Sequence, residues 1–239
     1  MRGAAILSGI DNAIVVDIGG TTSDVGVLAD GFPRESNSHI NVGGVRTNFR
    51  MPDILTIGLG GGSLVRDSGI SIGLQSVGHR LVSEGLVFGG DTLTTTDIAV
   101  ANGSCEVGDK DRISRLDSDE VETATQTIHN IIDDAIDKMR PSKEPVPVIL
   151  VGGGAILISR QLETALQLIQ PEYAEVANAI GAAIAQVGGE VEYIVSYSEI
   201  ERETALKKIT EEAELKAISA GADESTLRVL DVEETTMSY

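Results

Sequence analysis

Residues 13–28, AIVVDIGGTTSDVGVL, constrain the fold of this chain more than any other stretch of its sequence. Residues 13–16 form a short apolar run rich in β-branched side chains, which indicates a buried strand. Residues 25–28 are apolar again, so we expect the chain to return as a second strand. The polar, glycine-rich residues between them are typical of a turn. The stretch therefore predicts a β-hairpin whose tip carries hydroxyl and carboxylate groups.

The chemistry of this tip suits a phosphate group that is accompanied by a cation. Gly19 and Gly20 can adopt backbone angles closed to other residues and leave room for a ligand, and the amides of such a turn form a concavity for anions. Three hydroxyl groups add donors for phosphate oxygens, those of Thr21, Thr22 and Ser23. Asp17 and Asp24 would repel a bare phosphate, so their presence makes sense only if a cation such as Mg²⁺ accompanies it. We therefore expect Mg²⁺ to be held at Asp17, and both carboxylates to act in catalysis. The alternative is a plain hairpin turn that is capped by Asp and Thr side chains.

Two later glycine clusters each follow an apolar, strand-like run. They lie in residues 53–63, DILTIGLGGGS, and in residues 147–158, PVILVGGGAILI. A buried strand that leads into a glycine turn at the start of a helix is a favourable place for a nucleotide. The nucleotide-binding candidates in these two loops are Gly60, Gly61, Gly62, Ser63, Gly152, Gly153, Gly154 and Ala155. Taken alone, either loop is also compatible with a flexible turn.

Elsewhere the spacing of apolar residues predicts a succession of helices and short strands. The clearest helix covers residues 117–140, with Asp117 and Glu120 in a capping pattern. A helix within residues 92–100 is expected to be capped by Thr96 or Asp97. Further helices are expected over residues 161–169, 176–187 and 198–220, the last with a Ser198/Glu201 capping box, and further strands over residues 191–196 and 227–232.

Charge and composition argue against several classes of function. The net charge of −19 at pH 7 opposes binding to nucleic acid or to an anionic membrane, because no basic patch is present to neutralise phosphates. A single cysteine, Cys105, excludes an internal disulfide and fits a reducing compartment. The histidines His39, His79 and His129 lack the spacing of a metal site. No apolar run reaches membrane-spanning length, and we predict a cytoplasmic globular protein.

The first and third glycine clusters, in VVDIGGTTSDVGVL (15–28) and VILVGGGAILIS (148–159), resemble the second phosphate motif and the adenosine motif of the superfamily that contains actin, sugar kinases and heat-shock ATPases. More narrowly, the chain resembles the hydantoinase/oxoprolinase family, of the N-methylhydantoinase A type. The matching stretches, which cover most of residues 1–195, are DIGGTTSDVGV (17–27), IGLGGGS (57–63), FGGDTLTTTDIAV (88–100), VGGGA (151–155) and ANAIGAAIAQVGGEV (177–191). The resemblance implies an enzyme that uses ATP and Mg²⁺ to hydrolyse cyclic amides such as hydantoins or 5-oxoproline.

The same resemblance implies roles for residues of the glycine clusters. Asp17 would serve the network of Mg²⁺ and its waters. Residues 19–22 would hold phosphates, and residues 152–155 would lie against the adenosine. Thr96 and Asp97 match a Thr-Asp pair that is usual in the family and to which the sequence assigns no role.

The chain departs from the family pattern in two respects. Leu74 and Gln75 stand where the family has a proline and an acid, so a role for that acid does not carry over. Family chains also have an earlier half with its own phosphate loop, which leads us to expect a C-terminal fragment or one product of a split gene. Its partners would be the missing N-terminal lobe or a separate subunit that completes the ATP cleft, in a homo-oligomer or hetero-oligomer. The chain alone would then be inactive.

We therefore predict an α/β fold made of two parts. Residues 1–195 would form an actin-type, ribonuclease-H-like ATPase lobe with a mixed sheet flanked by helices, and residues 196–239 a small C-terminal αβ extension. The predicted function is the ATP-binding portion of a hydantoinase/oxoprolinase-type enzyme. Two alternatives are an ATP-dependent conformational or chaperone-like module and a small-molecule kinase.

Overall fold

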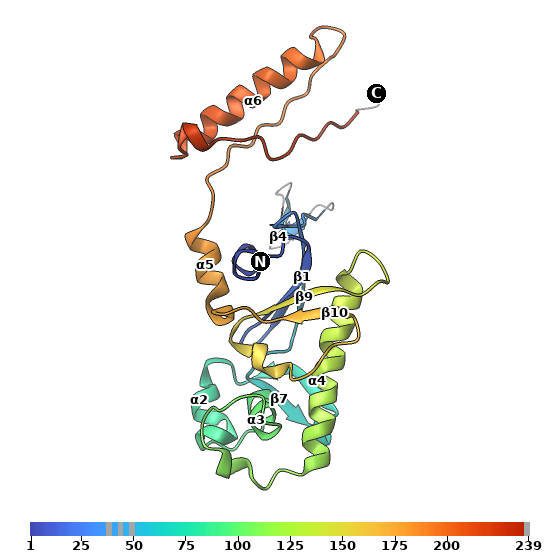
Figure 1. Cartoon of the computed structure of the whole chain (residues 1–239), viewed down its shortest axis with the longest axis vertical. Coiled ribbons are helices and arrows are strands. Elements are labelled where there is room, and N and C mark those ends of the chain that lie inside the picture. The colour runs from blue at the N-terminus through green and yellow to red at the C-terminus, as the bar shows by residue number, and fades with distance from the viewer. Residues whose placement is uncertain (37–39, 43–44, 48–50, 237–239) are drawn as a thin grey trace. The chain divides into compact units, whose positions relative to one another are not determined.

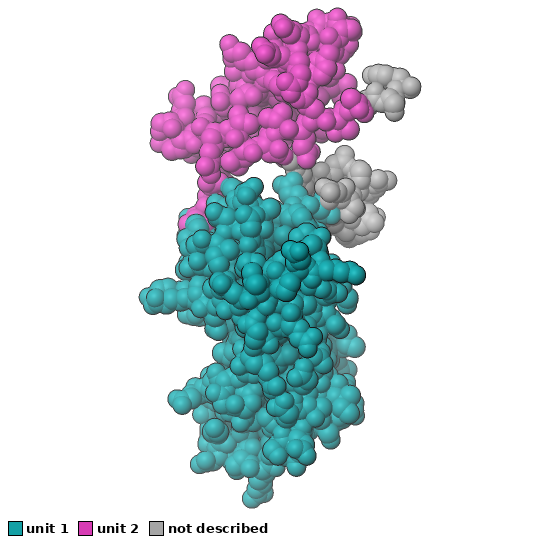
Figure 2. Space-filling view, turned by 45° about the vertical axis from the view of Figure 1, so that its right-hand side comes forward, with its two compact units in different colours: residues 1–183 teal, residues 184–239 magenta. Residues whose placement is uncertain are grey.

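The structure, a computed structural model, describes residues 1–36, 40–42, 45–47 and 51–236. The chain divides into two compact units, residues 1–183 and residues 184–239 (Figure 1 and Figure 2). This division lies twelve residues before the boundary proposed from the sequence, 195 − 183 = 12. The first unit, called unit 1 below, contains all three glycine clusters.

A mixed six-stranded sheet forms the centre of unit 1 (Figure 1). Its strands are β1 (Ala13–Ile18), β2 (Ser23–Ala29), β3 (Phe32–Pro33), β6 (Ile54–Ile57), β9 (Val146–Val151) and β10 (Ala165–Ile169). The strand order is β10–β9–β1–β2–β3, and β6 also pairs with β2. β1 and β2 form the predicted antiparallel hairpin, whereas β9 runs parallel to β1 and β10 runs parallel to β9. The predicted lobe with a mixed sheet is thereby confirmed.

Alternating side chains of β1 divide the core of unit 1 between the two faces of this sheet. Ile14 and Val16 pack in a cluster with residues of α3 (Thr95–Ala101) and α4 (Ser118–Met139). Ala13 and Val15 pack in a second cluster with residues of α1 (Arg2–Ser8) and α5 (Ala177–Ala183). Helices thus cover both faces, which explains why β1 is a continuous apolar run rather than an alternating one.

α4 confirms the long helix that the sequence predicts, and Figure 1 shows it beside the sheet. Asp117 is its N-cap, and the side chain accepts hydrogen bonds from the N–H groups of Asp119 and Glu120, 2.8 and 3.3 Å long. Ile128 and Ile132, one turn apart, are buried in the core beneath it. The cap and the apolar stripe together therefore define this helix from local sequence alone.

The remaining elements of unit 1 are short. They are β4 (Ile40–Val42), β5 (Val45–Thr47), β7 (Ser63–Arg66), β8 (Ser71–Ser76) and α2 (Leu81–Glu84). β4 pairs antiparallel with β5, and β7 pairs antiparallel with β8. The β7–β8 pair continues directly from the second glycine loop.

The helix predicted over residues 161–169 is wrong. β10 occupies Ala165–Ile169, and Leu168 pairs with Val148 of β9. The spacing of Leu162 and Ala165 suits a helix as well as a strand, because a short apolar run does not distinguish the two. The parallel pairing with β9 is a non-local contact, and it decides in favour of the strand.

The second unit contains one long helix, α6 (Arg202–Ser219). Glu201 is its N-cap without a side-chain hydrogen bond, so the predicted Ser198/Glu201 capping box is wrong. The strands predicted over residues 191–196 and 227–232 are also wrong, since the described residues of this unit include no strand. An isolated extended segment has no neighbour to receive its backbone hydrogen bonds. Among the described helices of the whole chain, none has the length and apolar character needed to span a bilayer.

Candidate functional site

β1 places Asp17 at the end of the sheet, on the face that α1 and α5 cover. The side chains of Ala13, Val15 and Asp17 alternate onto that face. The first two are buried, and the carboxylate of Asp17 is half-buried. Its Oδ2 atom accepts a hydrogen bond of 2.8 Å from Nδ2 of Asn178, which belongs to α5. Asp17 is therefore the first charged group beyond an apolar layer, and one of its oxygens already has a partner.

Asp24 lies directly opposite Asp17 in the β1–β2 ladder. Opposite residues of an antiparallel pair share a face, with Cβ atoms about 4.5–5.5 Å apart, and like charges there are destabilising. Asp24 is exposed, and its Oδ1 accepts a 2.6 Å hydrogen bond from Oγ1 of Thr56. A cation beside the two carboxylates would relieve their repulsion. The described residues contain no group of three or more metal-ligating side chains, so such a cation would need further oxygens from a ligand.

The turn between these carboxylates is open to solvent. The N–H of Gly19 donates to the carbonyl of Thr22 at 2.9 Å. Gly20, Thr21 and Thr22 are exposed, and a Cβ at Gly20 would meet nothing within 4 Å. Ser23 is buried, and its hydroxyl donates to a main-chain carbonyl at 2.6 Å. The tip therefore offers main-chain amides and two threonine hydroxyls. The hydroxyl of Ser23, which the sequence predicted as a third donor to phosphate, is already bonded within the protein.

The third glycine cluster packs against the end of β1 that leads into the hairpin tip. Gly152, just after β9, has a φ of 86°, which favours glycine. A Cβ here would lie 2.4 Å from the carbonyl oxygen of Ile18 and 2.5 Å from Oδ1 of Asp17, and one at Gly154 would lie 2.5 Å from Cγ2 of Ile18. Gly153 between them is exposed, with nothing within 4 Å of its Cβ position. The outer glycines thus contact the hairpin, and the middle one faces open space.

A short 3₁₀ helix, Gly153–Leu157, follows this loop in place of the helix that the sequence suggested. Ala155 lies within it and is buried in the core of unit 1. Its side chain therefore supports the loop from below, and any contact of Ala155 with a nucleotide remains a prediction.

The second glycine loop lies against the hairpin tip and is enclosed by protein. Its four candidate residues are buried: Gly60, Gly61, Gly62 and Ser63. The N–H of Gly61 donates to the carbonyl of Gly19 at 2.9 Å, and the N–H of Gly62 donates to that of Gly20 at 2.7 Å. The N–H of Gly60 donates to Oγ of Ser63 at 2.9 Å. Because these donors already have protein partners, the contacts favour support of the tip, and direct nucleotide binding by this loop remains a prediction.

Two threonines at the start of α3 hold this second loop. Oγ1 of Thr95 donates to the carbonyl of Gly60 at 2.5 Å, and Oγ1 of Thr96 donates to the carbonyl of Gly61 at 2.7 Å. Both threonines are buried. The hydroxyls therefore fix the loop that in turn contacts the hairpin tip.

Asp97 is the second half of a capping box for α3. Its Oδ2 accepts hydrogen bonds from both the N–H and the hydroxyl of Thr94, each 2.7 Å long, and its Oδ1 accepts one of 2.8 Å from the N–H of Val87. The capping role expected for Asp97 is confirmed, but the N-cap itself is Thr94 rather than Thr96. The Thr-Asp pair of the family pattern thus has a structural role in this chain.

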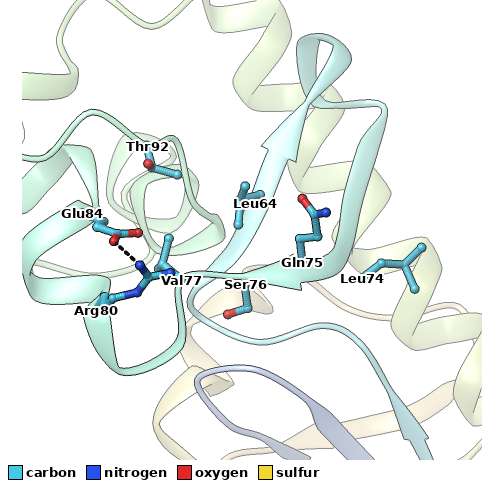
Figure 3. A pocket seen from close by; sticks show the side chains of 8 residues that line it. All are labelled: Leu64, Leu74, Gln75, Ser76, Val77, Arg80, Glu84 and Thr92. Atoms are coloured by element: carbon cyan, nitrogen blue, oxygen red, sulfur yellow. Dashed lines mark ion pairs between the residues drawn. The ribbon is translucent and has the colours of Figure 1, made fainter.

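An open pocket of about 460 Å³ adjoins the second loop (Figure 3). Apolar, neutral polar and paired charged side chains line it: Leu64, Leu74, Gln75, Ser76, Val77, Arg80, Glu84 and Thr92. Arg80 and Glu84 form an ion pair of 2.9 Å, drawn as a dashed line in Figure 3. Oγ of Ser76 donates to the carbonyl of Gly20 at 3.3 Å, which joins the pocket to the hairpin tip. Leu74, one of the two departures from the family pattern, is 99% exposed and has a φ of 57°.

Two further titratable side chains pack in or against the core: His129 is buried and Cys105 is half-buried. Nδ1 of His129 lies 2.6 Å from the carbonyl oxygen of Thr125, and Nε2 accepts the N–H of Ser159 at 3.1 Å. A carbonyl only accepts and a main-chain N–H only donates, so these partners require the neutral Nδ1–H tautomer. Burial lowers the pKa of His129 and raises the pKa of the Cys105 thiol. Both side chains are therefore uncharged at neutral pH.

Sequence reasoning missed Asn178 as a member of the site. The stretch ANAIGAA, residues 177–183, was matched to the family, but its one polar side chain received no role. The only signal in the sequence was one amide among small apolar residues, and since Asn178 is exposed, a solvated helix surface explains it equally well. Its partner Asp17 lies far away in the sequence, so the contact itself could not be read from local pattern.

Comparisons with known proteins agree with this geometry. A family model described as hydantoinase/oxoprolinase matches residues 2–109, which include the hairpin, the second glycine loop and α3. A nucleotide-free acetone carboxylase is 19% identical with a TM-score of 0.58, and an ATP-dependent caprolactamase from Pseudomonas jessenii is 18% identical with a TM-score of 0.66. A search of the curated proteins finds no match.

Each of these two structural alignments covers 92% of this chain and 38% of the solved chain. The chain therefore spans less than two fifths of the length of these solved proteins. At such low identity the likeness shows a shared fold, and the family rests on the matched sequence. The resemblance to the hydantoinase/oxoprolinase family that the motifs indicate is borne out over residues 2–109, the part of the chain that the family model matches.

Proposed function

We propose that unit 1 is the nucleotide-binding lobe of an ATP-dependent enzyme that acts on a cyclic amide. One observation carries the proposal: three glycine clusters meet at a hairpin whose two carboxylates, Asp17 and Asp24, lie opposite each other. Exposed amides and hydroxyls beside paired carboxylates suit a phosphate chain that arrives with Mg²⁺, because the cation offsets both repulsions.

In this proposal the groups at the tip have distinct roles. Residues 20–22 donate hydrogen bonds to phosphate oxygens, and Gly19, whose N–H donates to the carbonyl of Thr22, shapes the turn. Asp17 orients the waters of Mg²⁺ with Asp24 beside it. Residues 152–155 lie against the adenosine, with Gly153 as the open surface. Residues 60–63 support the tip through its carbonyl groups. These roles combine what the family resemblance implies with the contacts described above.

Bound Mg-ATP would supply a transferable phosphoryl group, which can activate an amide carbonyl that is otherwise a poor electrophile. The contribution of this chain is to position the phosphates and the metal waters in a fixed, partly enclosed field, which provides most of the catalysis in phosphoryl transfer. A cyclic amide of the hydantoin or 5-oxoproline class is proposed because the family contains such enzymes and the fold is shared with a caprolactamase. We place this activity in the cytoplasm.

A second lobe completes the proposed cleft. The solved proteins of this fold are longer, and the chain aligns with 38% of each. The lobe could come from further domains or from a separate subunit. Either source would cover the exposed tip and supply a second set of phosphate contacts.

Product analysis of the complete enzyme tests this function. Hydantoin, 5-oxoproline and caprolactam are offered with Mg-ATP, and ADP, phosphate and ring-opened product are measured, with the Asp17→Asn variant as the control. Release of ADP that requires a cyclic amide and yields a ring-opened product supports the proposal. ADP release without ring opening would favour a conformational module, and a phosphorylated end product would favour a kinase; either result overturns it.

A further inference from the structure

We infer that Asn178 is a positioning residue that fixes the Asp17 carboxylate for its task at the metal. The inference rests on the proposed function, because it concerns the same site. Nδ2 of Asn178 donates to Oδ2 of Asp17 at 2.8 Å, and this bond joins α5 to the end of β1. No other side-chain hydrogen bond to Asp17 is found in the part of the chain that the structure describes.

The second oxygen of Asp17, Oδ1, lies beside Gly152. The position that a Cβ of Gly152 would occupy is 2.5 Å from Oδ1, so only a glycine leaves room for the carboxylate there. One oxygen is thus held by an amide donor, and the other lies in a space that the third glycine cluster leaves free. The carboxylate has a defined orientation before any ligand arrives, which is the condition for an effective site.

Close packing of two helices sets the place of Asn178. A Cβ at Gly3 of α1 would lie 1.9 Å from the carbonyl oxygen of Ala177, so the two helices approach to main-chain contact. Ala177 is buried in the cluster that also contains Ala4 and Val15. The residue next to Asn178 is therefore anchored in the core, and the amide is directed from a rigid element rather than from a loop.

The choice of a neutral amide is itself informative. A lysine or arginine at this place would form an ion pair with Asp17 and cancel the charge that attracts a cation. An asparagine orients the carboxylate without bringing a positive charge of its own. Asn178 is also exposed, and a hydrogen bond of this kind contributes only about 0.5–1.5 kcal/mol to stability. Its value to the fold is small, which separates a positioning role from a purely structural one.

The test uses the complete enzyme and has a readout that does not depend on turnover. Mn²⁺ is titrated in the presence of ATP, and the broadening of the backbone amide resonances of residues 19–22 is followed by NMR. The variants are Asn178→Ala and Asn178→Leu, the second of which keeps the volume without the donor. Asn102→Ala is the matched control, since Asn102 also makes a side-chain hydrogen bond inside unit 1, to Thr125. Asp17→Asn tests the site itself.

We expect both Asn178 variants to need about tenfold more Mn²⁺ for the same broadening, the usual loss for a partner of a metal-site carboxylate. Their Tm should change no more than that of Asn102→Ala. Wild-type Mn²⁺ dependence in both variants, with loss in Asp17→Asn, would overturn the inference and leave the proposed function standing. A weaker response accompanied by a much lower Tm would show a structural role and also overturn it. Absence of broadening in the wild-type complete enzyme, or broadening unaffected by Asp17→Asn, would refute the proposed site and the inference together.

Discussion

Replacing Gly60 by alanine tests whether the second glycine loop holds the hairpin tip in place. The new Cβ would lie 2.5 Å from the nitrogen of Thr21, 2.6 Å from the carbonyl carbon of Gly20 and 2.7 Å from the oxygen of Gly19. All three are main-chain atoms, so no side-chain rotation can relieve the overlap. An ordinary contact begins at 3.4 Å, so the loop and the tip must separate by 3.4 − 2.5 = 0.9 Å.

We expect this separation to lower both stability and activity. Overpacking costs about 1–3 kcal/mol, and the reduced freedom of the unfolded chain returns about 0.4–1 kcal/mol. The middle of these two ranges gives a net loss of about 1.3 kcal/mol, which corresponds to a fall of roughly 3–5 °C in Tm for a protein of this size. A displacement near 1 Å in a positioning element costs on the order of 100-fold in turnover of the complete enzyme.

Gly153→Val is the matched comparison, because nothing lies within 4 Å of its Cβ position. It should leave Tm unchanged and weaken ATP binding, since the branched side chain fills the space proposed for the adenosine. Scanning calorimetry and ATP titration of the complete enzyme measure both quantities for both variants. An unchanged Tm for Gly60→Ala would refute the supporting role of the second loop. Equal losses of Tm and of binding in Gly153→Val would refute the open surface at Gly153.

Other side chains of unit 1 provide shorter tests. Asp17→Asn should reduce Mg-ATP turnover of the complete enzyme far more than stability, whereas near-normal turnover with a loss of about 1–2 kcal/mol would mean that Asp17 only caps the turn. Asp97→Ala leaves the donors of Thr94 and Val87 without their buried acceptor, so urea unfolding should show a loss of about 2–4 kcal/mol, and a loss well below this would contradict the capping box. Burial lowers the pKa of His129 below its usual 6.5, so as the pH falls the unfolded chain binds the proton first. The free energy of unfolding should therefore decrease as the pH falls from about 6.5 towards the lowered pKa, and the His129→Gln variant should lack that component.

Local pattern was sufficient wherever one element carries its own signal. The hairpin of β1 and β2 follows from two apolar runs around a glycine turn, and α4 follows from its cap at Asp117 and its apolar stripe. The prediction for β10 was wrong because its strand conformation depends on pairing with β9, a contact that the residues of β10 do not determine by themselves. The strands expected after residue 184 failed for the related reason that the sequence supplied extended segments without a partner.

In the candidate site, too, local features could be predicted from the sequence and contacts between distant segments could not. The sequence predicted that Gly19, Gly60 and Gly152 belong to loops. It did not show which glycines contact a ligand and which contact another segment of the protein. Gly60 and Gly152 are required because main chain or a carboxylate of another segment occupies the space of their side chains. Gly20 and Gly153 have that space free. Only the packing of distant segments distinguishes these two kinds of glycine, and so it also decides which residues remain candidates for the nucleotide.

The same distinction predicts that Mg-ATP binds only weakly to this chain alone. In the part that the structure describes, Gly20, Thr21, Thr22 and Gly153 are exposed, so a nucleotide placed on the tip would be covered on one side. In the superfamily that the motifs resemble, the nucleotide lies between two lobes that each supply a phosphate loop. Loss of one set of phosphate contacts should weaken binding by several kcal/mol, and each 1.4 kcal/mol is about tenfold in affinity. Water at the transferring phosphoryl group would also remove much of the electrostatic stabilisation. Isothermal titration of the purified chain should therefore give no binding at micromolar Mg-ATP and no hydrolysis above background, and micromolar affinity would show that one lobe is a sufficient site.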